Sequence, residues 1–159
     1  MRSASCLLVL LLALSACANA VPPKTAPARA AAPVAASFGR TWDAVIDAFA
    51  AKNIGIRTID RSSGLLVADP VSAPPWNRDD RDTPSDLADC GRDHVGGFGM
   101  HFVPPARGYY NVLVRGDSTK STVLVTVRWI AAFTNIDCTS SGVWEGQFES
   151  AVKARAERR

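Results

Sequence analysis

The chain has 159 residues, and its 18 Lys and Arg nearly balance its 15 Asp and Glu, which leaves a formal net charge of +3. No basic stripe alternates with aromatic residues, and this excludes the usual pattern of a nucleic-acid-binding surface. The sequence contains no phosphate-binding loop, dinucleotide fingerprint, serine nucleophile elbow or zinc-protease motif, so it predicts neither an enzyme nor a cofactor. The length suits one domain with a sizeable core.

The N-terminus carries the three parts of a secretory signal. Arg2 supplies a positive charge, residues 7–14 form a short apolar run, and two small residues precede Cys17. The apolar run is shorter than the roughly 20 residues that a membrane-spanning helix needs. We therefore expect residues 1–16 to be removed as a signal peptide.

Residues 14–17 read Leu-Ser-Ala-Cys, which resembles the lipobox of envelope lipoproteins of diderm bacteria. The resemblance implies that Cys17 is acylated and becomes the first residue of a chain anchored in the lipid bilayer. Ala18 at the next position resembles chains that are sorted to the outer membrane, here at its periplasmic face, with the inner membrane as the alternative. An ordinary signal peptide cut after Ala18 or Ala20 is the other interpretation left open.

Residues 17–36 continue from this cysteine as a segment rich in Pro and Ala and without aromatic residues. Proline removes backbone donors and favours extended geometry. We therefore expect a tether that leads to a single folded domain at residues 37–159.

The domain begins with an amphipathic helix, predicted to start near residue 41 and to end at residues 53–55. Its apolar face holds Trp42, Val45, Ile46 and Phe49, at the spacing of one helical face. Apolar residues at 54–59 and 64–68, joined by a turn-forming stretch, predict a strand pair. Two alternating runs at 110–115 and 122–129 predict a hairpin with one solvent-exposed face.

A second helix is predicted from about residue 142 onward. Its apolar face holds Trp144, Phe148, Ala151 and Val152. Glu145 and Glu149 are expected to complement the positive N-terminal end of the helix dipole. The element order is then α-β-β-loop-β-β-α, and the predicted fold is α+β, an antiparallel four-stranded sheet with two helices packed on one face.

Residues 70–108 form a long loop without apolar periodicity, and such loops are usually functional or disordered. Cys90 in this loop and Cys138 are the two cysteines that remain after signal-peptide removal and acylation of the lipobox cysteine. In an oxidising compartment this pair predicts a disulfide. A zinc site built from these two cysteines with His94 and His101 is the alternative, although no second closely spaced ligand pair supports it.

Two aromatic residues, Trp76 and Phe102, lie in the same loop. Aromatic side chains, Trp above all, are enriched at interface hot spots. We therefore consider Trp76 and Phe102 candidates for partner binding, with packing of Trp76 back over the sheet as the alternative.

The first helix and strand pair carry a further resemblance. The pattern Trp42-x-x-Val-x-x-Ala-Phe, followed by Ile-x-Ile at 54–56, Asp60 and Gly64, is similar to the helix-grip domains of the accessory lipoprotein of the β-barrel assembly machinery. The resemblance implies a scaffold without catalysis. This chain has room for one such domain rather than two, and its cysteine-containing loop departs from the pattern.

The expected function is that of a non-catalytic envelope lipoprotein, without metal or cofactor, which binds an envelope protein through the exposed sheet face or the loop. The alternative is a carrier or sensor of a small apolar or lipidic ligand in a groove between sheet and helices. A cavity lined by Ile56, Val123, Val125 and Trp144 would favour the carrier. A filled core would favour the protein-binding module.

Overall fold

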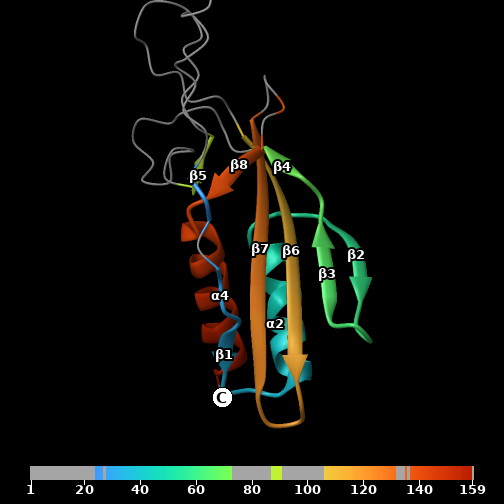
Figure 1. Ribbon diagram of the computed structural model, residues 1–159. Coiled ribbons are helices and arrows are strands. Elements are labelled where there is room, and N and C mark those ends of the chain that lie inside the picture. Colours follow the sequence, from blue (N-terminus) through green and yellow to red (C-terminus); the bar gives the residue numbers. More distant parts are fainter. Residues whose placement is uncertain are drawn as a thin grey trace, which may run out of the picture.

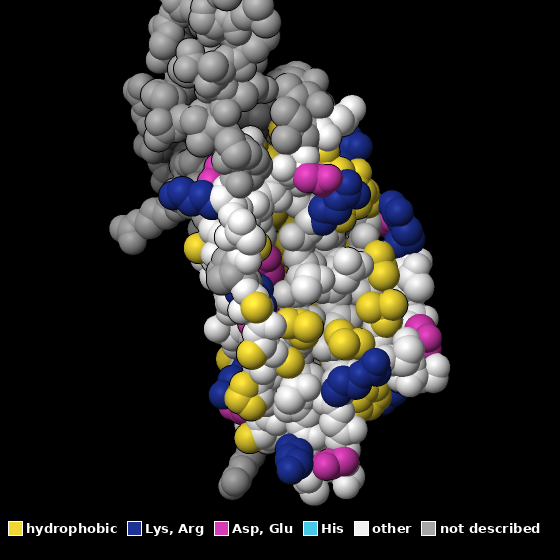
Figure 2. All heavy atoms as spheres, viewed as in Figure 1, with side chains coloured by type: hydrophobic (Ala, Val, Ile, Leu, Met, Phe, Trp, Pro, Cys, Tyr) yellow, Lys and Arg dark blue, Asp and Glu magenta, His cyan; other side chains and the backbone are white. Residues whose placement is uncertain are grey.

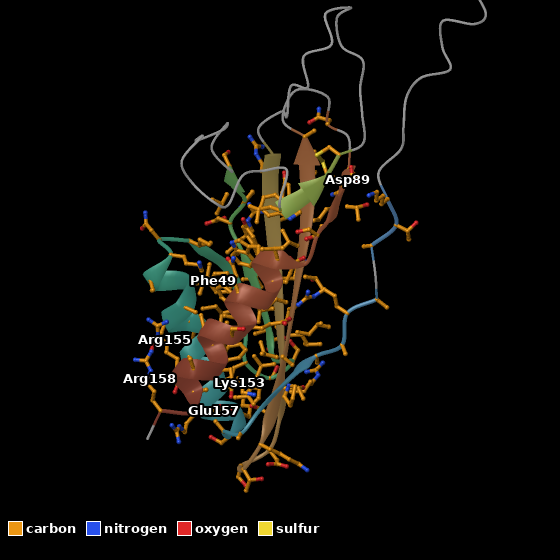
Figure 3. All side chains as sticks on the ribbon, turned by 90° about the vertical axis from the view of Figure 1, so that its left-hand side faces the viewer. Phe49, Asp89, Lys153, Arg155, Glu157 and Arg158 are labelled. Atoms are coloured by element: carbon orange, nitrogen blue, oxygen red, sulfur yellow. A yellow bond between two sulfur atoms is a disulfide. The ribbon has the colours of Figure 1, made fainter. Side chains whose placement is uncertain are left out.

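The computed structural model describes residues 24–26, 28–72, 87–90, 106–131, 135 and 137–158. Its elements are β1 (Ala32–Val34), α2 (Phe38–Ala51), β2 (Ile56–Asp60), β3 (Leu65–Ala68), β4 (Val71–Ser72), β5 (Ala88–Asp89), β6 (Ala106–Gly116), β7 (Ser121–Ala131), β8 (Asp137–Ser140) and α4 (Val143–Ala156). The helices α2 and α4 pack against each other and against β6 and β7, and no described helix covers the other face of these strands, which we call the open face (Figures 1 and 3).

The strands form one eight-stranded sheet in the order β2-β3-β6-β7-β8-β5, with β1 also pairing with β7 and β4 with β6. The predicted four-stranded sheet is therefore wrong, although the fold is α+β. The four predicted runs are present as β2, β3, β6 and β7. The four additional strands are two to four residues long, and strands this short carry too few residues to show an alternating pattern.

The long hairpin of β6 and β7 is the centre of the sheet. It pairs in continuous register from Ala106 opposite Ala131 to Gly116 opposite Ser121, longer at both ends than the alternating pattern predicted. Its helix-facing side supplies the core, with Val112, Val114, Val123 and Val125 all fully buried. The alternation of apolar and polar residues thus identifies the buried face correctly.

The helix α2 begins at Phe38, earlier than predicted, because the hydroxyl of Ser37 accepts a hydrogen bond from the backbone N–H of Arg40. Its buried face contacts α4 through the rings of Phe49 and Phe148, whose centroids are 4.7 Å apart. The hydroxyl of Thr41 lies 2.6 Å from that of Ser121 and ties the helix to the start of β7.

The N-terminal segment belongs to the fold from well before residue 37. Its strand β1 pairs with residues 121–123 of β7, and Val34 and Ala36 are buried. We call residues 24–26 and 28–36 the N-terminal strap, because they run along the side of α4 next to the edge of β7 (Figure 3). The expected domain start at residue 37 is thus too late. The prolines predict an extended tether, but residues 32–34 of this stretch pair with β7.

Candidate binding surfaces

Several of the sequence-predicted site residues lie outside the described residues. These are Cys17, Trp76, His94, His101 and Phe102. The lipidation site and the aromatic candidates for partner binding therefore stay predictions.

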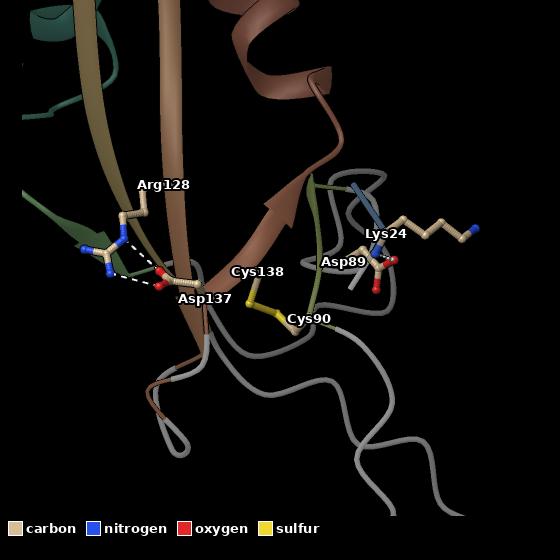
Figure 4. Close-up of a disulfide and its surroundings, with 6 residues drawn as sticks. All are labelled: Lys24, Asp89, Cys90, Arg128, Asp137 and Cys138. Carbon is tan, nitrogen blue, oxygen red and sulfur yellow. Dashed lines mark hydrogen bonds and ion pairs between the residues drawn. A yellow bond between two sulfur atoms is a disulfide. The ribbon is translucent and has the colours of Figure 1, made fainter. Parts of the chain in front are cut away.

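The predicted disulfide between Cys90 and Cys138 is confirmed (Figure 4). It joins the described segment 87–90 to β8, and β5 pairs with β8 beside it. Because both sulfurs are engaged in the bond, neither is available as a thiolate ligand, and the alternative zinc site is wrong. Within the described ranges, no group of three or more His, Cys, Asp or Glu could hold a metal ion.

An exposed ion pair fastens β8 to β7 at the same end of the sheet (Figure 4). The guanidinium of Arg128 donates to both carboxylate oxygens of Asp137, with N–O distances of 2.7 and 3.0 Å. This hydrogen bonding lowers the pKa of Asp137 and raises that of Arg128. Both side chains are more than half exposed, so the contact positions β8 more than it stabilises the fold.

The open face of the sheet carries a row of three leucines. Leu65, Leu113 and Leu124 stand opposite one another on β3, β6 and β7. Their chain neighbours Leu66, Val112 and Val125 are fully buried toward the helices, so these leucines point away from the helices. Each is half-buried, and hydrophobic side chains gather in the middle of this face (Figure 2). We call Leu65, Leu113 and Leu124 the leucine row.

One edge of β7 is left without a strand over part of its length. The strand β1 pairs with β7 as far as Val123, and β8 pairs with it from Trp129 onward. On that side, no described strand pairs with residues 124–128. We call residues 124–128 with this open edge the β7 gap.

A buried glutamate fills part of the β7 gap. Glu149 of α4 is 7% exposed, and its Oε1 accepts a hydrogen bond of 3.0 Å from the backbone N–H of Val125. Its Oε2 pairs with Arg29 of the strap at 2.7 Å, and the same guanidinium donates to the carbonyl of Gly142. Arg29 thus compensates a carboxylate that lies in the interior beside the sheet edge.

The remaining space in the β7 gap is a cavity of about 500 Å³ between β7, β8, the strap and the start of α4. Its lining residues are Ala26, Arg29, Leu124, Thr126, Val127, Arg128, Asp137, Cys138, Thr139, Ser140, Ser141, Gly142 and Glu145. Glu145 is 1% exposed, and its Oε2 has no hydrogen-bond partner among the described groups. Burial and, to a smaller extent, the charge of Glu145 raise the pKa of Tyr110.

The groove expected for a carrier is filled by side chains. Val123 and Val125 are fully buried in the core. The ring of Trp144 packs against those of Tyr110 and Phe148, with centroids 4.2 and 5.0 Å away. In the described part of the chain, the packing between sheet and helices therefore supports a filled core.

The sequence does not predict the role of three charged residues at the β7 gap, Arg29, Glu145 and Glu149. Arg29 lies in the interval 17–36, for which the composition predicts a tether, and Glu145 and Glu149 lie where they are expected to complement the helix dipole. A signal was present, because each glutamate directly follows an aromatic residue of the apolar face, Trp144 or Phe148. Such positions border the buried stripe of a helix.

None of the described helices is long and apolar enough to cross a membrane. No protein-family model matches this chain, and no curated protein is significantly similar to it in sequence.

Proposed function

We propose that the chain is a non-catalytic lipoprotein of the bacterial envelope, anchored through acylated Cys17, whose domain binds a protein partner through the open face of its sheet. The observation that carries the binding role is the leucine row. Three large apolar side chains stand in register on a sheet face that no described helix covers, and exposed apolar patches mark interaction sites.

The filled core supports the protein-binding role over the carrier role. A carrier needs an apolar cavity that encloses most of its ligand, and the valines expected to line it are fully buried by their neighbours. The apolar surface that is left for contact lies on the outside of the sheet.

The strap determines how far the proposed anchor can stand from the domain. The backbone N–H of Lys24 donates to Asp89 over 3.2 Å, so the strap reaches the end of the domain that carries the disulfide (Figure 4). Only six residues separate Cys17 from Lys24, and a fully extended chain spans at most about 25 Å over that interval. The proposed anchor therefore holds the disulfide end of the domain near the bilayer, with the turn between β6 and β7 at the far end.

A comparative capture experiment tests the proposed function. The full chain, tagged at its C-terminus, is isolated from membranes dissolved in a mild neutral detergent, and co-purifying proteins are quantified by mass spectrometry. The variant Leu113→Thr/Leu124→Thr removes apolar surface from the leucine row and introduces β-branched residues, which suit a strand. We expect this variant to lose a partner that the wild-type chain retains.

The matched control is Ile59→Thr, which removes an equally apolar strand residue that is 55% exposed. Ile59 stands opposite Leu66 in register and so lies away from the leucine row. If the leucine-row variant keeps every partner of the wild type, or if the control loses the same partner, the open face is not the binding surface.

A further inference from the structure

We propose that the β7 gap binds a short extended peptide segment that carries a lysine or arginine side chain. This inference rests on the proposed function, because it names the chemistry of the partner segment that reaches the edge of the open sheet face. The peptide would pair with the free edge of β7, and its cationic side chain would bind Glu145.

The backbone of β7 offers hydrogen-bonding groups to such a segment. The N–H of Val125 points into the gap but already donates to Glu149, which leaves the C=O of Val125 for an added segment. Backbone groups of a strand alternate between its two sides, so the N–H and C=O of Val127 point the same way. An unpaired strand edge is a template for an added strand, and β1 and β8 confine the free edge here to residues 124–128.

The charges around the cavity favour a cation. Arg29 is paired with Glu149, although its buried Nε has no acceptor among the described groups, and Arg128 is paired with Asp137. Among the described residues, Glu145 takes part in no salt bridge, and its buried Oε2 has no hydrogen-bond partner. A buried carboxylate is costly without a donor or a counter-charge, so an ammonium or guanidinium group brought by the occupant would satisfy it.

The position of the gap connects it with the leucine row. Leu124 belongs to the row and also lines the cavity. A protein that covers the open face can therefore extend a segment over the edge of β7 into the gap without leaving the surface. This continuity favours a peptide over an isolated small amine.

Fluorescence anisotropy with labelled pentapeptides tests the inference on the purified full chain in neutral detergent. The probe is acetyl-Thr-Val-Lys-Val-Thr-amide, compared with peptides that carry norleucine or glutamate in place of lysine. We expect saturable binding of the lysine peptide, and binding of the other two that is weaker by about tenfold or more, because the charge-assisted contact is lost.

Two variants locate the binding in the β7 gap. Glu145→Gln is expected to bring the affinities of the lysine and norleucine peptides within about twofold of each other. The matched control Glu157→Gln makes the same change at the residue that directly follows α4 and does not line the cavity, and it is expected to keep the preference for lysine. Ala26→Trp fills the cavity from an exposed position, where it leaves the core intact, and is expected to weaken binding of the lysine peptide by tenfold or more.

Several results would overturn the inference. They are an absence of saturable binding, a lysine preference that survives in Glu145→Gln, full binding by Ala26→Trp, or displacement of the peptide by n-butylammonium at an equal concentration. The peptide assay requires neither acylation nor a native partner. Failure of peptide binding, when the capture experiment does find a partner that depends on the leucine row, thus refutes the inference alone. Intact peptide binding, when the capture experiment finds no partner that depends on the leucine row, refutes the proposed function alone.

Discussion

Removal of Arg29 tests whether the N-terminal strap is part of the fold. In Arg29→Ala, Glu149 keeps the hydrogen bond that it accepts from the N–H of Val125 but loses the guanidinium that pairs with it at 2.7 Å. Removing one partner of a buried ion pair lowers the free energy of unfolding by about 3 to 5 kcal/mol, whereas an exposed ion pair contributes about 0 to 1 kcal/mol. Because the Arg29 side chain is 28% exposed and that of Glu149 only 8%, we expect destabilisation by about 2 to 3 kcal/mol.

Urea unfolding followed by circular dichroism measures this change in the free energy of unfolding. In thermal unfolding, the melting temperature should fall by about 6 to 12 °C. The double variant Arg29→Ala/Glu149→Gln distinguishes the cause. A glutamine carbonyl still accepts from Val125 but leaves no charge buried, so the double variant should be more stable than Arg29→Ala. The matched control Arg128→Ala breaks an exposed ion pair and should cost less than about 1 kcal/mol.

If Arg29→Ala destabilises the protein as little as Arg128→Ala, the strap contributes no more than a surface contact. A second contradicting outcome is a double variant that is no more stable than Arg29→Ala. That result would mean that the cost does not come from an unpaired carboxylate.

Three further perturbations have expected outcomes. Reduction of the Cys90–Cys138 bond, which closes a loop with a sequence separation of 48, should lower the free energy of unfolding by about 4 kcal/mol; an unchanged urea midpoint under reductant would argue against this. Gly64→Ala should destabilise by more than about 1 kcal/mol, because Gly64 has a φ of +69° and an added Cβ would lie 2.1 Å from a carbonyl oxygen of β6; a melting temperature equal to that of the wild type would contradict it. Hydrogen bonds, first that from the hydroxyl of Thr119, lower the pKa of Asp117 from 3.8 to about 2. The contribution of the Asp117 carboxylate to the free energy of unfolding is therefore complete above pH 3.8 and is lost as the pH falls toward 2. Asp117→Asn should flatten the decline of stability over that interval. Identical acid-unfolding profiles of variant and wild type would refute the role of this carboxylate.

The sequence predicts the elements whose burial follows a period. The spacing of Trp42 and Phe49 indicates the first helix, and the alternation through Val112 and Val125 indicates the central hairpin. The even pair of cysteines predicts the disulfide. In each case the local pattern and the tertiary contact agree.

The remaining strands and the β7 gap depend on contacts between distant segments, which no local pattern records. Val34 is buried because β1 pairs with β7, although it follows a proline in an alanine-rich stretch. Glu149 is buried because it contacts Val125 and Arg29, which lie 24 and 120 residues away along the chain. Helix-dipole reasoning explains a glutamate in a first turn, but it cannot show which face of the helix the sheet covers.

The intact mass of the protein extracted from membranes, with sequencing of its N-terminal peptide, tests the central claim of a lipid-anchored module most directly. We expect a mature chain that begins at Cys17 and carries a diacylglyceryl group on that thiol, with or without a third, amide-linked acyl chain. A mature chain that begins elsewhere, or that carries an unmodified Cys17, would contradict it.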